Sequence, residues 1–137
     1  MPADRRAVVV LAAVIERDGR FLVTRRREGT HLSGYWEFPG GKCERDETHE
    51  QCLARELLEE LNVGADIGPE IMTTEHAYAD RTVRLHFRSC RLHGAPVPML
   101  GQDMKWVARQ DLESLPFPDA DRALLEKLRA APTPRRP

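Results

Sequence analysis

The chain has 137 residues, of which 41% are hydrophobic, so it is long enough for one domain with a well-buried core. Its 21 basic and 22 acidic residues leave a formal net charge of −1, and this balance excludes a global field that would attract nucleic acid polymers or a membrane surface. Three cysteines without metal-site spacing, Cys43, Cys52 and Cys90, predict a reduced, cytoplasmic protein in which the thiols are small packing groups.

The N-terminal part of the chain is rich in strand-forming residues. Residues 7–15 and 20–25 flank a turn at Asp18-Gly19 and predict a β-hairpin. The apolar run from Ala7 to Val14 is too short to span a bilayer, so we interpret it as a buried strand. The next segments are expected to be a polar loop at 26–34, a short strand at 35–38 and a turn at 39–41.

The following segment has the capping pattern and the periodicity of a helix from about 49 to 61. Thr48 and Gln51 stand at capping-box spacing at its start. An apolar stripe recurs every three to four residues at Leu53, Ala54, Leu57, Leu58 and Leu61. Asn62 is expected to end this helix in the left-handed conformation.

The remaining chain is expected to mix strands and helices. We predict strands at 71–78, 82–92 and 104–108, a helical turn at 110–115, and a last helix capped by Asp119 or Asp121. This order predicts an α+β protein, an α/β/α sandwich around a mixed sheet. The basic, Pro-rich tail at 131–137 is expected to fray, so the predicted single domain occupies 1–137 with its core at about 6–130.

The helix at 49–61 carries three carboxylates along one side, at Glu56, Glu59 and Glu60. Residues three and four apart on a helix are neighbours, so each like-charge pair is unfavourable by roughly a few tenths of a kcal/mol. A solvated acidic face is one interpretation of this ridge. The other is that a hard cation such as Mg²⁺ or Mn²⁺, which prefers oxygen ligands, holds the carboxylates together.

A glycine pair precedes this helix, in Gly40-Gly41-Lys42. Glycines let a ligand approach the backbone closely, and Lys42 can bind phosphate. A P-loop would require Gly five residues before the Gly-Lys pair and a hydroxyl after it, but Trp36 and Cys43 occupy those places. The P-loop interpretation is therefore excluded.

The stretch from Gly41 to Val63 resembles the signature of the Nudix hydrolases. That signature is Gly, five residues, Glu, seven residues, then Arg-Glu-apolar-X-Glu-Glu-X-Gly-apolar. The matching residues are Gly41, Glu47, Arg55, Glu56, Leu57, Glu59, Glu60 and Val63. Asn62 stands where the family usually has Gly, and Asn tolerates positive φ better than most residues. Segments 23–26, 36–42 and 117–121 are similar to the MutT branch, so the resemblance covers nearly the whole chain.

This resemblance implies a Nudix α/β/α sandwich and a role for each matching residue. Mg²⁺, with Mn²⁺ as an alternative, is the implied cofactor. The implied metal ligands are the Gly40 carbonyl, Glu56, Glu59 and Glu60. The implied catalytic residues are Glu59, Glu60, Arg55 and Glu47. Among these, Arg55 and Glu47 orient the carboxylates that hold the metal. The resemblance also implies that Lys42 and Arg26 bind the phosphates. The residues implied to bind the rest of the nucleotide are His31, Glu37, Phe38 and Asp121.

The residue that deprotonates or orients the water is predicted to be Glu59 or Glu60. The MutT branch often has a further acidic residue in a later loop, where this chain has Leu100 before Gly101-Gln102. Since Leu can neither ligate a metal nor accept a proton, either the signature helix supplies the base alone, which we favour, or Asp103 substitutes.

Asp121 is assigned to base recognition by the resemblance, with a helix N-cap as the alternative. An ionised Asp accepts a hydrogen bond from the cytosine amino group, and a protonated Asp also donates to a carbonyl. Trp36 and Phe38 are candidates to flank the base by stacking, although Trp36 is equally expected as an ordinary core residue.

The implied activity is hydrolysis of nucleoside triphosphates, including oxidised or otherwise modified ones, to the monophosphate and pyrophosphate. The partner is a small-molecule nucleotide; neither a nucleic acid polymer nor a membrane is expected, and a monomer and a homodimer both remain open. One alternative is a hydrolase of a nucleoside diphosphate linked to another group. The other is a nucleotide sensor without turnover, for which Leu100 is the hint and the intact glutamates are the counterargument.

Overall fold

A computed structural model describes residues 6–29 and 33–130 of the chain. The elements follow in the order β1 (Arg6–Arg17), β2 (Arg20–Arg25), β3 (Trp36–Glu37), β4 (Gly40–Lys42), α1 (His49–Leu61), β5 (Ala65–Ala77), β6 (Arg81–Leu92), β7 (Met104–Ala108), 3₁₀ turns at Arg109–Ser114 and Asp119–Asp121, and α2 (Arg122–Ala130). Asp18 and Gly19 have φ angles of 54° and 76°, as a tight hairpin turn between β1 and β2 requires. The predicted α+β class is confirmed.

Strand β1 is the centre of a mixed sheet whose order is β3-β2-β1-β6-β5. It pairs in parallel with β6 and antiparallel with β2 and β4, which share its other edge: Val10–Ala12 face β4, and Glu16–Arg17 face β2. Strand β7 adds to β2, and β5 is antiparallel to β6. The parallel pair arises because the chain crosses from β1 to β6 by way of α1, and the β1–β4 pairing brings the glycine pair to the middle of the sheet.

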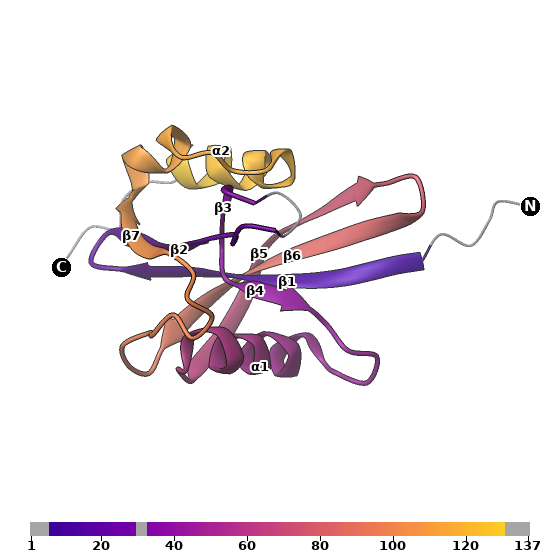
Figure 1. Cartoon of the computed structure of the whole chain (residues 1–137), viewed down its shortest axis with the longest axis horizontal. Coiled ribbons are helices and arrows are strands. Elements are labelled where there is room, and N and C mark those ends of the chain that lie inside the picture. Colours follow the sequence, from indigo (N-terminus) through magenta and orange to yellow (C-terminus); the bar gives the residue numbers. More distant parts are fainter. Residues whose placement is uncertain (1–5, 30–32, 131–137) are drawn as a thin grey trace, which may run out of the picture.

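The alternation of side chains along β1 divides the core into two layers. Leu11, Ala13 and Ile15 point toward α1 and pack with its leucines, whereas Ala12 and Val14 point toward α2. Figure 1 shows the sheet between α1 on one face and α2 on the other. The predicted α/β/α sandwich is therefore confirmed.

Helix α1 begins and ends as the sequence predicts. The Thr48 hydroxyl accepts from the Gln51 N–H, and the Gln51 side chain accepts from the Thr48 N–H, which completes the capping box. Asn62 has a φ of 51°, and its N–H donates to the Leu58 carbonyl. Asn thus forms the left-handed turn that the family usually assigns to Gly.

Beyond shifts of one or two residues at element ends, the structure differs from the prediction in the following segments. Gly40–Lys42 is not a turn but strand β4. Strand β5 begins at Ala65 rather than 71, because two irregularities on either side of Glu70 break the alternation by which strands are recognised. Helix α2 begins at Arg122, after a separate 3₁₀ turn that contains both predicted capping aspartates.

No helix within the described ranges is long and apolar enough to cross a membrane. The tail at 131–137, for which fraying is predicted, lies outside the described residues.

Candidate active site

A cleft of about 430 Å³ lies where β1, β4 and α1 meet the β5–β6 hairpin and the segment before α2. Its ionisable lining is contributed by Arg26, Glu37, Lys42, Glu56, Tyr78, Glu60 and Asp121. Its apolar lining includes Leu11, Phe38, Val83 and Leu85. Most of the site residues predicted from the sequence, Gly40 among them, therefore surround one cavity. They come from segments far apart in the sequence, from Arg26 to Asp121.

The glycine pair of β4 forms a close contact on each side of the strand. Gly40 has a φ of 155°, and a Cβ there would lie 2.0 Å from the Leu11 carbonyl oxygen of β1. A Cβ on Gly41 would lie 2.4 Å from the Glu56 carboxylate. Only glycine lets β4 pair with β1 while the Glu56 carboxylate lies directly against its backbone.

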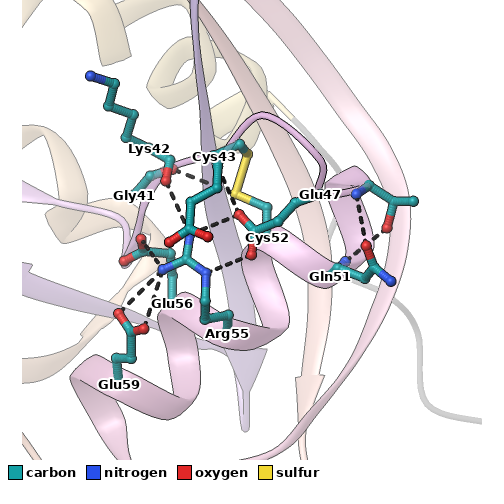
Figure 2. The surroundings of a disulfide bond; sticks show 11 residues. Gly41, Lys42, Cys43, Glu47, Gln51, Cys52, Arg55, Glu56 and Glu59 are labelled. Atoms are coloured by element: carbon teal, nitrogen blue, oxygen red, sulfur yellow. Dashed lines mark hydrogen bonds and ion pairs between the residues drawn. A yellow bond between two sulfur atoms is a disulfide. The ribbon is translucent and has the colours of Figure 1, made fainter.

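Arg55 connects the signature loop to the acidic ridge of α1, as Figure 2 shows. Its Nε and Nη2 donate to the two oxygens of Glu47 at 2.5 and 2.8 Å, and Nη1 donates to Glu56 at 3.0 Å and to Glu59 at 3.3 Å. Nη2 also donates to the Lys42 carbonyl at 3.2 Å. The Arg55 hydrogen bonds lower the pKa of Glu47 to about 2, and the carboxylates raise the pKa of Arg55. Both groups are therefore charged, and Arg55 holds the Glu56 carboxylate in place.

The three carboxylates of the ridge have different surroundings. Glu60 is half-buried in the cleft and accepts from the Gly40 N–H at 3.2 Å. Burial, followed by the charges of Glu56 and Glu37, raises its pKa to about 8. Burial also raises the pKa of Glu56. Glu59 does not line the cleft, and its side chain is 58% exposed beside Arg55.

These oxygen donors fit a divalent cation. Glu56 and Glu60 line the same cleft, and the charge of Glu56 raises the pKa of Glu60, so the metal-free site is deficient in positive charge. The glycine backbone at Gly41 adjoins Glu56 without an intervening side chain. Carboxylate and carbonyl oxygens are the ligands that Mg²⁺ and Mn²⁺ prefer.

Two basic residues border this acidic end of the cleft. Lys42 is exposed on β4, and Arg26 follows β2. The Arg26 Nη1 donates to Glu37 at 2.8 Å, which lowers the pKa of Glu37, but burial outweighs this effect and the net shift is upward. Arg26 and Lys42 thus bring positive charge to a cleft otherwise dominated by carboxylates.

The other end of the cleft is aromatic and contains Asp121. Phe38 stacks on Phe117 with a centroid distance of 5.5 Å and meets Phe87 edge-on at 6.2 Å. Asp121 is only 6% exposed, and burial, with a contribution from Glu37, raises its pKa to about 7. Its carboxylate forms no hydrogen bond with any residue of 6–29 or 33–130, so the N-cap alternative is not supported.

Trp36 and His31 are the two remaining candidates for contact with the nucleotide. Trp36 is 7% exposed and packs in the core beneath the Lys105 ammonium, 4.5 Å from the ring, and it does not line the cleft. The core alternative for Trp36 is therefore correct. His31 lies outside the described residues.

Neither Leu100 nor Asp103 lines the cleft. Leu100 is 45% exposed, and its N–H donates to the Gln102 side chain, whose amide donates to the Glu60 carbonyl at 3.3 Å. Asp103 forms an ion pair with Arg25. The loop therefore contacts the backbone of α1 but places no carboxylate in the cleft, which favours the signature helix as the source of the base.

Sequence reasoning missed the β5–β6 hairpin as a wall of the cleft. Tyr78, Val83 and Leu85 line it, and Arg81 lies over the Tyr78 ring at 5.9 Å. Their place follows from the parallel pairing of β1 with β6, in which Val83 is the partner of Val8 and Leu85 the partner of Val10. A long-range register of this kind has no local signal in the sequence.

Cys43 and Cys52 form a disulfide between the signature loop and α1 (Figure 2). The prediction of reduced thiols is wrong for this pair, whereas Cys90 is free and buried as expected. Spacing gave no indication of the bond, because only the return of the loop onto α1 brings the two cysteines together. The bond closes the loop that contains Glu47.

Reduction of the Cys43–Cys52 bond is expected to lower the stability of the protein without unfolding it. Closing a loop with a sequence separation of 9 residues restricts the unfolded chain, which contributes about 2.6 kcal/mol. The melting temperature should then fall by about 9 °C. Calorimetry with and without dithiothreitol measures the change, and Cys43→Ser should show no response to the reductant. An unchanged melting temperature after thiol titration has verified reduction would contradict the expectation.

The chain is similar in sequence and in fold to known proteins. Residues 10–127 match the family model described as the NUDIX domain. The chain is 36% identical over 124 residues to the CTP pyrophosphohydrolase of Escherichia coli, covering 90% of this chain and 92% of that protein. It is 30% identical over 122 residues to the 8-oxo-dGTP diphosphatase of the same organism, covering 88% and 95%. The solution structure of the E. coli ORF135 protein superposes with a TM-score of 0.84 at 34% identity, covering 95% of this chain and 96% of that one.

Proposed function

The chain belongs to the Nudix hydrolase family, and we propose that within this family it is a Mg²⁺-dependent nucleoside triphosphate pyrophosphohydrolase. The observation that carries the proposal is a single cleft with Glu56 and Glu60 at one end and Phe38 with Asp121 at the other. Such a cleft matches a ligand that has a polyanionic end and a flat, hydrogen-bonding end. The relatives named for CTP and 8-oxo-dGTP support triphosphates, including modified ones, as the substrate class.

The residues proposed to hold Mg²⁺, or Mn²⁺ in its place, are Glu56, Glu60 and the Gly40 carbonyl, with Glu59 as a further ligand at the cleft edge. When bound, the cation neutralises phosphate oxygens and lowers the pKa of a coordinated water. Arg55 and Glu47 act as positioning residues, because Arg55 links Glu47 in the loop to Glu56 and Glu59 on the helix.

Glu60 is the candidate that accepts a proton from the attacking water, with Glu59 as the alternative. One Glu60 oxygen accepts from the Gly40 N–H, which leaves Oε1 for the proton. Lys42 and Arg26 are proposed to stabilise the negative charge that develops on the phosphates.

Nudix hydrolases act on small nucleotides, and a cytoplasmic location would provide nucleoside triphosphates. No nucleic acid polymer or membrane is proposed as a partner, and both a monomer and a homodimer are compatible with a cleft built from one chain.

A substrate panel in the presence of Mg²⁺ tests the proposed activity. It includes the ordinary triphosphates, 8-oxo-dGTP, 5-methyl-dCTP and nucleoside diphosphates linked to a sugar. Release of pyrophosphate and a monophosphate from a triphosphate is the expected result. Turnover of only the linked diphosphates would favour the second hydrolase class, and binding of nucleotides without any turnover would indicate a sensor.

Replacement of Asp121 by Asn is expected to remove the pH dependence of base preference. Asp121 titrates near pH 7, so above this pH its carboxylate only accepts and suits the amino group of cytosine. In the wild type, the kcat/KM ratio of cytidine to uridine triphosphate should rise about tenfold from about pH 6 to about pH 8. Asn presents a donor and an acceptor throughout, so its ratio should be flat.

The control for this experiment is Asp119→Asn, which changes an exposed carboxylate two residues away. It should retain the pH profile of the wild type. The same rise of the ratio in the Asp121 variant would show that another group reads the base.

A further inference from the structure

Two histidines and a glutamate that the Nudix signature does not use meet at the start of α1. His49 is the first residue of α1, Glu70 lies at the irregular part of β5, and His86 lies on β6. One ligand atom from each residue lies within 4.8 Å of the other two. Among the residues that the structure describes, this group alone has three metal-ligating side chains so close together.

The proximity of these three side chains depends on the β5–β6 register. Thr73 is the partner of His86, and the irregularities that flank Glu70 bring its side chain back to the same imidazole. The His86 Nδ1 lies 2.5 Å from a Glu70 oxygen and 3.1 Å from the Thr73 hydroxyl. The His49 ring lies against the His86 ring with a centroid distance of 4.4 Å. Strands and helix thus converge on one point.

Charges around the group are compatible with a cation. The hydrogen bond to His86 is the largest cause of a lowered pKa at Glu70, so this carboxylate is ionised. Arg88 of β6 is the register partner of Glu70, and its guanidinium is engaged by other groups: Nη1 donates to Glu50 at 3.0 Å and Nε donates to the Gly68 carbonyl at 2.7 Å. Glu50 thus offsets the charge of Arg88.

An ion pair between Glu70 and His86 does not explain why the His49 ring also lies beside the His86 ring. The His49 ring makes no hydrogen bond with any residue in 6–29 or 33–130, although it lies against the His86 ring, and His86 is only 12% exposed. Two imidazoles and one carboxylate are a common ligand set for Zn²⁺, Co²⁺ and Ni²⁺ and leave a fourth position open. Mg²⁺ prefers oxygen ligands and is disfavoured here.

We propose that His49, Glu70 and His86 form a second metal site, selective for a transition metal of the zinc class and separate from the carboxylate site. Glu56 and Glu60 follow His49 along α1, and a helical rise of about 1.5 Å per residue places them roughly 10–16 Å from it along the helix axis. The bound ion would fasten the first turn of α1 to β5 and β6, so its main effect is on the stability of the helix that contains the signature glutamates.

Titration of the metal-free, disulfide-intact protein with Zn²⁺ in excess Mg²⁺ tests the proposal. Calorimetry should show one Zn²⁺ per chain and a raised melting temperature, and Co²⁺ should produce the visible absorption bands of a low-coordinate site. His49→Ala and Glu70→Gln should each weaken Zn²⁺ binding at least about tenfold. Since His49 is held by no hydrogen bond, its variant is expected to fold, which circular dichroism checks.

The matched control is His93→Ala, because His93 also pairs with a carboxylate, Asp66, at 2.9 Å, but without a third ligand. It should bind Zn²⁺ like the wild type. Glu56→Gln/Glu60→Gln should also retain Zn²⁺ binding, although it removes the proposed catalytic site. Loss of Zn²⁺ binding in that double variant, with binding intact in His49→Ala, would overturn the proposal. So would the absence of Zn²⁺ binding in the wild type.

Discussion

Glu60→Gln is expected to lower kcat about a thousandfold, the contribution typical of a positioned general base, and to stabilise the metal-free protein at alkaline pH. The amide keeps the size of the side chain and still accepts from the Gly40 N–H. It removes the carboxylate that lies half-buried near Glu56 and Glu37. Activity and metal-free stability should therefore change in opposite directions, which a merely structural role of Glu60 would not produce.

The pH dependence of the stability follows from the pKa of Glu60. Its value in the folded protein is about 8, against an ordinary 4.5, so the folded metal-free protein binds this proton more tightly than the unfolded chain. Stability is then highest with respect to this group below about pH 4.5 and falls as the pH rises toward 8. At about pH 9 the Gln variant should be more stable by about 1–3 kcal/mol, and near pH 4 the two proteins should be equal.

Denaturant unfolding in the presence of a chelator measures this difference, and steady-state kinetics with Mg²⁺ measures the loss of turnover. Glu44→Gln is the matched control, since Glu44 is an exposed glutamate of the same signature segment that does not line the cleft. It should change kcat less than about twofold. Full activity of Glu60→Gln would remove Glu60 from the proposed mechanism.

The sequence was sufficient for features that local rules determine. The capping box at Thr48, the leucine stripe of α1 and the left-handed Asn62 are set by residues within four positions of one another, and all three are present. The continuous apolar run from Ala7 to Val14 likewise predicted a buried strand. The signature spacing also predicted which carboxylates lie on one side of α1, because helix geometry alone decides this.

What the sequence left undetermined depends on contacts between distant segments. The sequence offered no reason to distinguish Glu59 from Glu60. In the structure, Glu60 lines the cleft and accepts a hydrogen bond from the Gly40 N–H of β4, whereas Glu59 does not line the cleft. The Cys43–Cys52 bond depends on the path of the loop back onto α1. The meeting of His49 with Glu70 and His86 depends on irregularities in β5 that break the strand pattern itself.

Arg55→Lys is expected to lower kcat/KM about 10–100-fold and to raise the Mg²⁺ concentration required for half-maximal activity. The planar guanidinium of Arg55 donates at the same time to Glu47, Glu56 and the Lys42 carbonyl. A lysine ammonium keeps the charge but cannot reproduce this fork of donors. The Glu56 carboxylate should then be less well positioned against β4, and so the requirement for Mg²⁺ changes with the rate.

Measuring activity as a function of Mg²⁺ concentration separates positioning from a general loss of structure. Glu47→Gln leaves a hydrogen-bond acceptor for Arg55 and should shift the Mg²⁺ dependence in the same direction by a smaller factor, because the charge assistance of the pair is lost. Arg45→Lys, an exposed arginine of the same loop, should leave the dependence unchanged. If Arg55→Lys lowered the rate but left the Mg²⁺ dependence the same as in the wild type, Arg55 would act on the phosphates directly rather than through Glu56.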